Sequence, residues 1–133
     1  MANIVALDVG TKRIGVAVAD SVVPIAIPLV TVEVDGTEID TIKRIVDDRS
    51  AGKVVVGYPR NQSGQATDQT AISEAVGRKI ADFVKVVYQD ESLTSIMAED
   101  RLKAAGKPYT KGDIDAAAAT IILQDYLEQN YAA

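Results

Sequence analysis

Two chemically important residue types are missing from this 133-residue chain, which contains no cysteine and no histidine. Without cysteine the chain has no disulfides, no thiolate metal sites and no cysteine nucleophile. Without histidine it lacks the usual general base and the usual ligand of transition metals. Any acid–base or metal chemistry therefore depends on carboxylates, which suit hard ions such as Mg²⁺ and Mn²⁺.

Long apolar segments are missing as well. The sequence has no apolar run of 18 or more residues, so we expect no transmembrane helix. Its N-terminus lacks the basic region and apolar stretch of a secretory signal, and we expect a cytoplasmic protein. With 47% hydrophobic and 25% charged residues, the composition is that of a globular protein, and the length fits a single domain over residues 1–133.

Positive charge is in deficit, with a formal net charge of −5. Taken alone, this balance argues against nucleic acid as a partner. The distribution indicates otherwise, because residues 101–111 carry four cations and no anion. Further cations lie on predicted turns near the motifs described below. We therefore predict one basic edge that binds nucleic acid, formed by Lys12, Arg13, Arg60, Arg101, Lys103, Lys107 and Lys111.

The hydrophobic periodicity predicts a strand-rich first part and a helix-rich last part. Strands are expected at 3–9, 14–19, 29–34, 53–58 and 84–88, and helices at 37–51, 67–84, 94–105 and 111–130. The first two strands form a hairpin around the turn 10–13. A strand meander followed by βαβ units predicts an α/β fold with a mixed five-stranded sheet and helices on both faces.

Asp8 lies within the apolar strand 3–9, where a carboxylate loses hydration and needs a metal, a cation or hydrogen-bond donors. An alternative is that Asp8 is a turn residue that accepts from the amide of Gly10 or Thr11. The flanking Leu7 and Val9 favour a continuous strand and therefore a working site.

Other carboxylates occur at the ends of predicted elements. Asp90 and Glu91 end the last strand, and Asp113 and Asp115 lie near the start of the last helix. Each has a simpler interpretation, as a solvated strand end or as an acidic residue favoured by the helix dipole, and we prefer the latter for Asp113. Central strands of an open α/β sheet end near one edge, which predicts a cluster suited to two-metal phosphodiester hydrolysis.

The polar turns allow a competing interpretation. A strand followed by Asp-x-Gly-Thr also describes the phosphate-binding hairpin of ATP-binding enzymes of the actin and sugar-kinase type. Those enzymes enclose the nucleotide between two such domains, and this chain has room for one. The loop 59–64 either positions a phosphate through Arg60 or is an ordinary surface loop.

Four segments in order resemble a known family. They are ALDVGTKRIGVAVAD (6–20), VVGYPRNQSGQ (55–65), DESLTS (90–95) and KGDIDAAAATIILQDYL (111–127). Nearly the whole chain resembles the YqgF/RuvX family of RNase H-like pre-16S ribosomal RNA nucleases, also described as Holliday-junction-resolvase-like proteins. The resemblance implies an RNase H-like fold and a catalytic site of Asp8, Glu91 and Asp115 that binds Mg²⁺ or Mn²⁺. It also implies trimming of the 5′ end of small-subunit ribosomal RNA, with cleavage of four-way DNA as the alternative.

Two positions depart from the family pattern. Ser92 stands where the family usually has arginine, which removes a cation that could contact a phosphate. Tyr58 replaces the usual leucine before Pro59, a change that we expect to be tolerated. Ser92 and the acidic balance favour a second reading, a non-catalytic nucleic-acid-binding module of the same fold. Monomer and homodimer both stay open, although a resolvase that cuts two strands symmetrically requires a dimer.

Overall fold

The computed structural model describes residues 3–20, 22–59, 65–91 and 94–130. Five strands and four helices are assigned in these ranges: β1 (Asn3–Val9), β2 (Arg13–Ala19), β3 (Ile27–Glu33), α1 (Glu38–Asp48), β4 (Ala51–Pro59), α2 (Asp68–Ile80), β5 (Lys85–Glu91), α3 (Thr94–Ala105) and α4 (Lys111–Asn130). The strands form one sheet in the order β3-β2-β1-β4-β5. β1 pairs antiparallel with β2 and parallel with β4, so the predicted mixed α/β sheet is confirmed.

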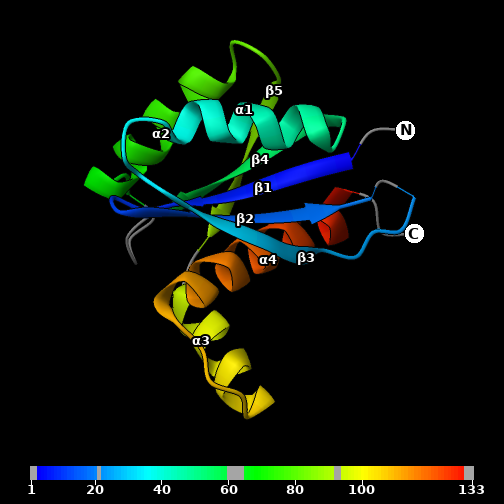
Figure 1. Ribbon diagram of the computed structural model, residues 1–133, viewed down its shortest axis with the longest axis vertical. Helices are drawn as coiled ribbons and strands as arrows, with labels where there is room; N and C mark the ends of the chain where they lie inside the picture. Colours follow the sequence, from blue (N-terminus) through cyan, green and yellow to red (C-terminus); the bar gives the residue numbers. More distant parts are fainter. Residues whose placement is uncertain (1–2, 21, 60–64, 92–93, 131–133) are drawn as a thin grey trace.

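Different helices cover the two faces of the sheet, with α1 and α2 on one face and α4 on the other, as Figure 1 shows. Leu7 of β1 points into a core that includes Ile42 of α1 and Ile80 of α2. Ala6 points to the opposite face, where it packs with Ile122 of α4. Because successive strand residues alternate between faces, Asp8 shares the α4 face with Ala6. The alternation thus directs the strand carboxylate toward α4.

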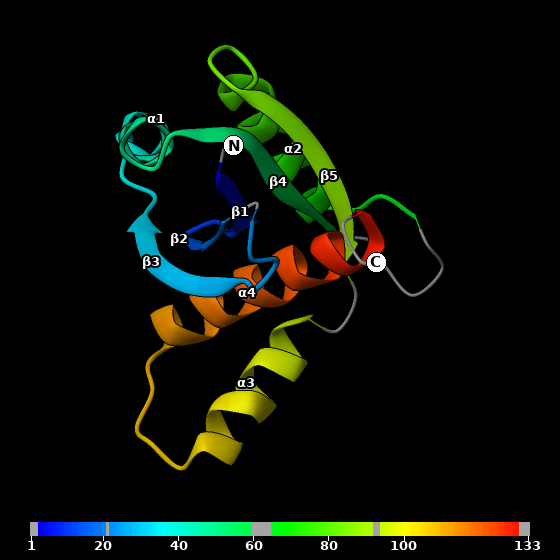
Figure 2. The ribbon, with the colours of Figure 1, turned by 90° about the vertical axis from the view of Figure 1, so that its right-hand side faces the viewer.

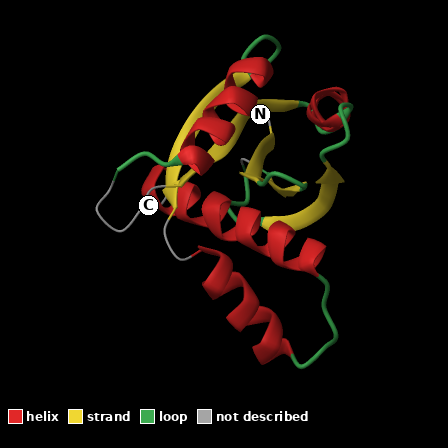
Figure 3. Ribbon diagram, turned by 90° about the vertical axis from the view of Figure 1, so that its left-hand side faces the viewer, coloured by secondary structure: helices red, strands yellow, loops and turns green. Residues whose placement is uncertain are grey.

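Helix α4 is buried on two sides. One side packs on the sheet through residues such as Leu123, and the other packs Ile121 against Ala98 of α3. Helix α3 packs against α4 at an angle and extends away from the sheet (Figures 2 and 3). The residues of α4 that are buried in this way include Ala119, Leu123 and Tyr126 on the sheet side and Ala118 and Ile121 on the α3 side. No helix in the described part of the chain is long and apolar enough to cross a membrane.

Several element boundaries differ from the sequence predictions; β4 spans Ala51–Pro59 rather than 53–58, and β5 spans Lys85–Glu91 rather than 84–88. Helix α1 ends at Asp48 rather than at residue 51, because Ser50 adopts a φ of 51° that a helix cannot continue. Helix α2 ends at Ile80, whose carbonyl oxygen accepts from the turn residues Phe83 and Val84. Strand β3 begins before Pro28, a residue that is tolerated because β3 lies at the edge of the sheet.

Candidate nuclease site

A close backbone contact brings Asp115 to Asp8. Asp8 of β1 is paired in register with Gly15 of β2. A Cβ atom added at Gly15 would lie 1.9 Å from the carbonyl oxygen of Asp115 and 2.2 Å from its carbonyl carbon. The backbone of α4 therefore rests directly on the strand beside Asp8, in space that only glycine leaves open.

The hairpin turn forms one wall of a cleft of about 430 Å³, which is lined by Asp8, Val9, Gly10, Thr11, Lys12, Arg13, Pro59, Gln69 and Asp115. The amide of Gly10 donates to the carbonyl oxygen of Arg13 at 2.9 Å and closes the turn. A Cβ at Gly10 would lie 2.7 Å from that same oxygen, so the turn also requires glycine. The predicted hairpin is confirmed, and it places Asp8 and Asp115 in one concave site.

The electrostatics of the two aspartates differ. Burial and the neighbouring Asp115 carboxylate raise the pKa of Asp8 from 3.8 to about 7. Asp115 instead accepts a hydrogen bond from Nε of Arg13, with 2.7 Å between Nε and Oδ2. The charge of Arg13 is thus directed at Asp115, while the negative charge of Asp8 has poor compensation. Half-buried carboxylates in this state are the oxygen donors that suit a hard divalent cation.

The third predicted ligand, Glu91, is the last residue of β5 and pairs in register with Pro59 of β4. Its side chain lies outside what the structure describes, and among the described residues no group of three potential ligands forms a metal site. Its role therefore stays a prediction.

Neighbouring acidic residues have other surroundings. Asp113 caps α4, because its Oδ2 accepts from the amide of Thr110 at 2.9 Å and its own amide donates to the Thr110 hydroxyl at 3.1 Å. This confirms the helix-terminus interpretation of Asp113. Asp90 is exposed and lines a separate cavity with Tyr58 and Tyr88. Neither residue lines the cleft of Asp8 and Asp115.

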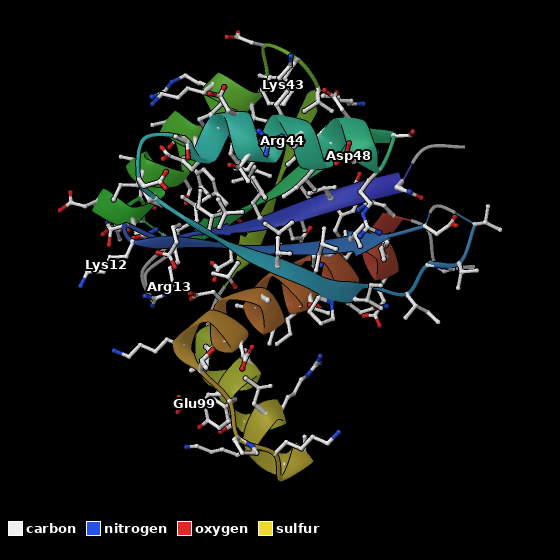
Figure 4. The ribbon with its side chains drawn as sticks, viewed as in Figure 1. Lys12, Arg13, Lys43, Arg44, Asp48 and Glu99 are labelled. Carbon is white, nitrogen blue, oxygen red and sulfur yellow. The ribbon has the colours of Figure 1, made fainter. Side chains whose placement is uncertain are left out.

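The predicted basic residues are distributed over two regions. Lys12 is exposed at the cleft, and its side chain extends away from the ribbon in Figure 4. Arg60 lies outside the described residues. Arg13 pairs with Asp115, as described above. The remaining four residues are exposed on α3, on the following loop and at the start of α4; they are Arg101, Lys103, Lys107 and Lys111. Glu99 pairs with Lys103 at 3.3 Å, so part of this charge is offset.

Sequence reasoning missed two features of the cleft. The side-chain amide of Gln69, near the start of α2, donates to the carbonyl oxygen of Val9 at 2.5 Å and fixes the end of β1. No motif in the sequence points to Gln69. Gly15 could have been found, because a glycine inside an apolar strand is a signal of close backbone approach. The hairpin register then places it opposite Asp8.

A sheet in this strand order, with an aspartate on its central strand and a helix lying against that residue, is the arrangement of the RNase H-like class of proteins. Within this class, the chain belongs to the RuvX family, whose model carries the description Holliday junction resolvase and matches residues 2–129.

Relatives agree with this assignment, and solved structures share the fold. A Salinibacter ruber protein named "Putative pre-16S rRNA nuclease" is 40% identical over 135 residues, covering 96% of this chain and 94% of the relative. A Chloroflexus aurantiacus protein of the same name is 40% identical, covering 94% of this chain and 86% of its own length. The fold is similar to T. thermophilus RuvC in complex with a Holliday junction substrate, with a TM-score of 0.57, 14% identity, and coverage of 100% and 98%. Fowlpox virus resolvase with junction DNA gives a TM-score of 0.58 at 14% identity, with coverage of 97% and 99%.

Proposed function

We propose that this protein is a metal-dependent endonuclease that hydrolyses phosphodiester bonds at the 5′ end of pre-16S ribosomal RNA during ribosome biogenesis. The proposal treats residues 1–133 as one nuclease domain that works in the cytoplasm, where ribosomal precursors are processed. The shared name of the relatives supports this substrate, and membership of the RuvX family supports the nuclease activity.

One observation carries the chemical part of the proposal. Asp8 and Asp115 line the same cleft, and burial together with repulsion from the Asp115 carboxylate raises the pKa of Asp8 to about 7. The ionised form of Asp8 is unfavourable in this arrangement unless a further cation compensates it. Carboxylate oxygens without histidine or thiolate favour Mg²⁺ or Mn²⁺ over softer metals.

In this proposal Asp8, Glu91 and Asp115 hold the divalent ions and are the catalytic residues. A bound divalent ion supplies an activated water and stabilises the leaving oxygen of the phosphodiester. The protein contributes the position of its carboxylates, which is set by the Asp8–Gly15 register and by the contact of α4 with β2. Lys12 is placed to attract the phosphate backbone, because it is exposed at the rim of the cleft.

A four-way DNA junction is the second candidate substrate. The description of the family model favours it, and two similar folds are resolvases in complex with junction DNA. Symmetric cleavage of a junction requires two copies of the chain, whereas trimming of one RNA end requires one. A complex in solution whose mass corresponds to two copies of the chain therefore favours the junction, and a mass that corresponds to one copy favours the RNA.

The test compares both substrates under one set of conditions. Purified protein with Mn²⁺ or Mg²⁺ is given an extended 16S precursor RNA and, separately, a four-way DNA junction. We expect cleavage of the RNA near the mature 5′ end, dependence on the metal, and loss of cleavage in Asp115→Asn and Glu91→Gln. Cleavage of the junction alone would replace the RNA substrate by DNA, and no cleavage of either would contradict the proposal.

A further inference from the structure

Arg13 differs from Lys12, the other cation among the described residues that line the cleft, because Arg13 forms an ion pair with a carboxylate of the candidate site. Its Nε lies 2.7 Å from Oδ2 of Asp115, and the side chains are 29% and 24% exposed. Ion pairs that are partly buried are screened by salt less than exposed ones. Lys12, its neighbour in the chain, is exposed and points away from the ribbon (Figure 4). Two adjacent cations thus have different environments.

The position of Arg13 is fixed by the backbone on both sides of the ion pair. Arg13 is the first residue of β2, and its carbonyl oxygen accepts from Gly10 to close the hairpin turn. Asp115 is fixed by the contact of its own backbone with Gly15, two residues after Arg13. The pair therefore joins the hairpin to α4 between two fixed backbone positions and is not an accidental encounter of long surface side chains.

The guanidinium of Arg13 has more N–H donors than its contact with Asp115 uses. Arginine carries five N–H donors, and the contact with Asp115 uses the one on Nε. The terminal nitrogens suit a phosphate, which arginine binds with paired hydrogen bonds. Arg13 lines the cleft with Asp8 and Lys12. A phosphodiester that enters the cleft therefore contacts a guanidinium that is already paired with Asp115.

We propose that Arg13 is the counter-ion of Asp115 in the metal-free protein. A divalent cation that binds Asp115 has to displace Arg13, and the guanidinium of Arg13 then binds a substrate phosphate. This inference rests on the proposed function and assigns a positioning role to Arg13 rather than a simple contact with nucleic acid. While Arg13 holds Asp115, its positive charge opposes a divalent cation at the same carboxylate. A phosphate that draws Arg13 away favours the metal, so metal and substrate bind with positive coupling.

Calorimetric titration with Mn²⁺ alone tests the role without relying on cleavage. The proteins are the wild type, Arg13→Gln, Arg13→Lys and the charge-matched control Lys12→Gln, each checked for folding by circular dichroism. We expect Arg13→Gln to lower the Mn²⁺ dissociation constant about tenfold, which corresponds to about 1.4 kcal/mol. Lys12→Gln removes the same charge from the same cleft without freeing Asp115, and it should lower the constant by about threefold at most. Arg13→Lys keeps a cation and should stay within about threefold of the wild type.

The outcomes separate this inference from the proposed function. If Arg13→Gln binds Mn²⁺ as the wild type does, or more weakly, or if Lys12→Gln has an equal effect, Arg13 is not the counter-ion that we propose. A wild type that cleaves RNA with Mn²⁺ while showing one of these results overturns the inference and leaves the nuclease intact. A wild type and Arg13→Gln that both fail to bind Mn²⁺ contradict both.

Discussion

The contact between Gly15 and α4 makes the Gly15→Ala substitution a sensitive probe of the site. The added Cβ would lie 1.9 Å from the carbonyl oxygen of Asp115, whereas ordinary contact begins at 3.4 Å. The atoms that it meets are backbone atoms on both sides, so no side chain can rotate away. Relief requires α4 and β2 to separate by about 1.5 Å.

Separation on that scale should affect stability and activity together. Overpacking of this kind costs about 1–3 kcal/mol, or roughly 4 °C in melting temperature for each kcal/mol in a domain of this size. Asp115 moves with α4 while Asp8 stays on β1, and misplacement by about 1 Å can lower a rate by about 100-fold. We therefore expect kcat/KM for cleavage of precursor RNA to fall by about 100-fold, even at temperatures where the variant is folded.

Thermal unfolding and steady-state cleavage measure the two effects. Gly112→Ala is the matched control, because it adds the same methyl group three residues before Asp115 on α4, where the nearest atom would lie 3.5 Å away. It should keep wild-type activity and gain up to about 1 kcal/mol from the better helix propensity of alanine. Wild-type stability and cleavage in Gly15→Ala would refute the role that we assign to this contact.

Further predictions concern pH, salt and the unusual tyrosine. Because the pKa of Asp8 is raised from 3.8 to about 7, the native state binds more protons than the unfolded state between these values, and the metal-free protein loses stability as pH rises through that window. In chelator, Asp8→Asn should therefore be more stable than the wild type, and the difference in free energy of unfolding should be larger at pH 8 than at pH 5 by on the order of 2 kcal/mol. A difference that does not grow with pH would contradict the burial of this charge. If the four cations of 101–111 all contact single-stranded RNA, the logarithm of the binding constant should fall with the logarithm of salt concentration with a slope of about −2.8, and a slope near zero would remove this face from the interface. Tyr58→Leu removes an edge-to-face contact with Tyr88 at 5.5 Å and a hydroxyl contact with Glu74 at 3.2 Å, so it should cost about 1 kcal/mol in thermal unfolding while leaving cleavage unchanged; a large loss of cleavage would show that Tyr58 serves the substrate.

The sheet could be predicted from the sequence because burial leaves a direct pattern in its strands. Strands such as β1 and β4 are apolar on both faces, as expected when helices cover both sides, and the predicted order of elements is confirmed. Element ends were less predictable, because they depend on single backbone conformations such as the positive φ of Ser50. The sequence also does not show that α4 is buried on two sides, because the burial of its second side depends on where α3 packs.

The candidate site was predictable only in part. Asp8 stands out because a charge inside an apolar strand is costly, and that cost is visible in the sequence. The Arg13–Asp115 pair joins residues 102 positions apart, and it depends on the hairpin register that places Gly15 beneath α4. Spacing along the chain carries no record of such a contact. The sequence grouped Arg13 with the cations that bind nucleic acid, whereas the structure pairs it with a carboxylate of the site.

Cleavage by Asp8→Asn tests the central claim most directly. The substitution keeps the size and shape of the side chain on β1 and removes the charge that a divalent cation requires. With Mn²⁺ or Mg²⁺ and an extended 16S precursor RNA, the wild type should cleave, and Asp8→Asn should lose cleavage while keeping the wild-type circular dichroism spectrum. Cleavage at the wild-type rate by folded Asp8→Asn would contradict the account, because it would place the chemistry outside the cleft of Asp8 and Asp115.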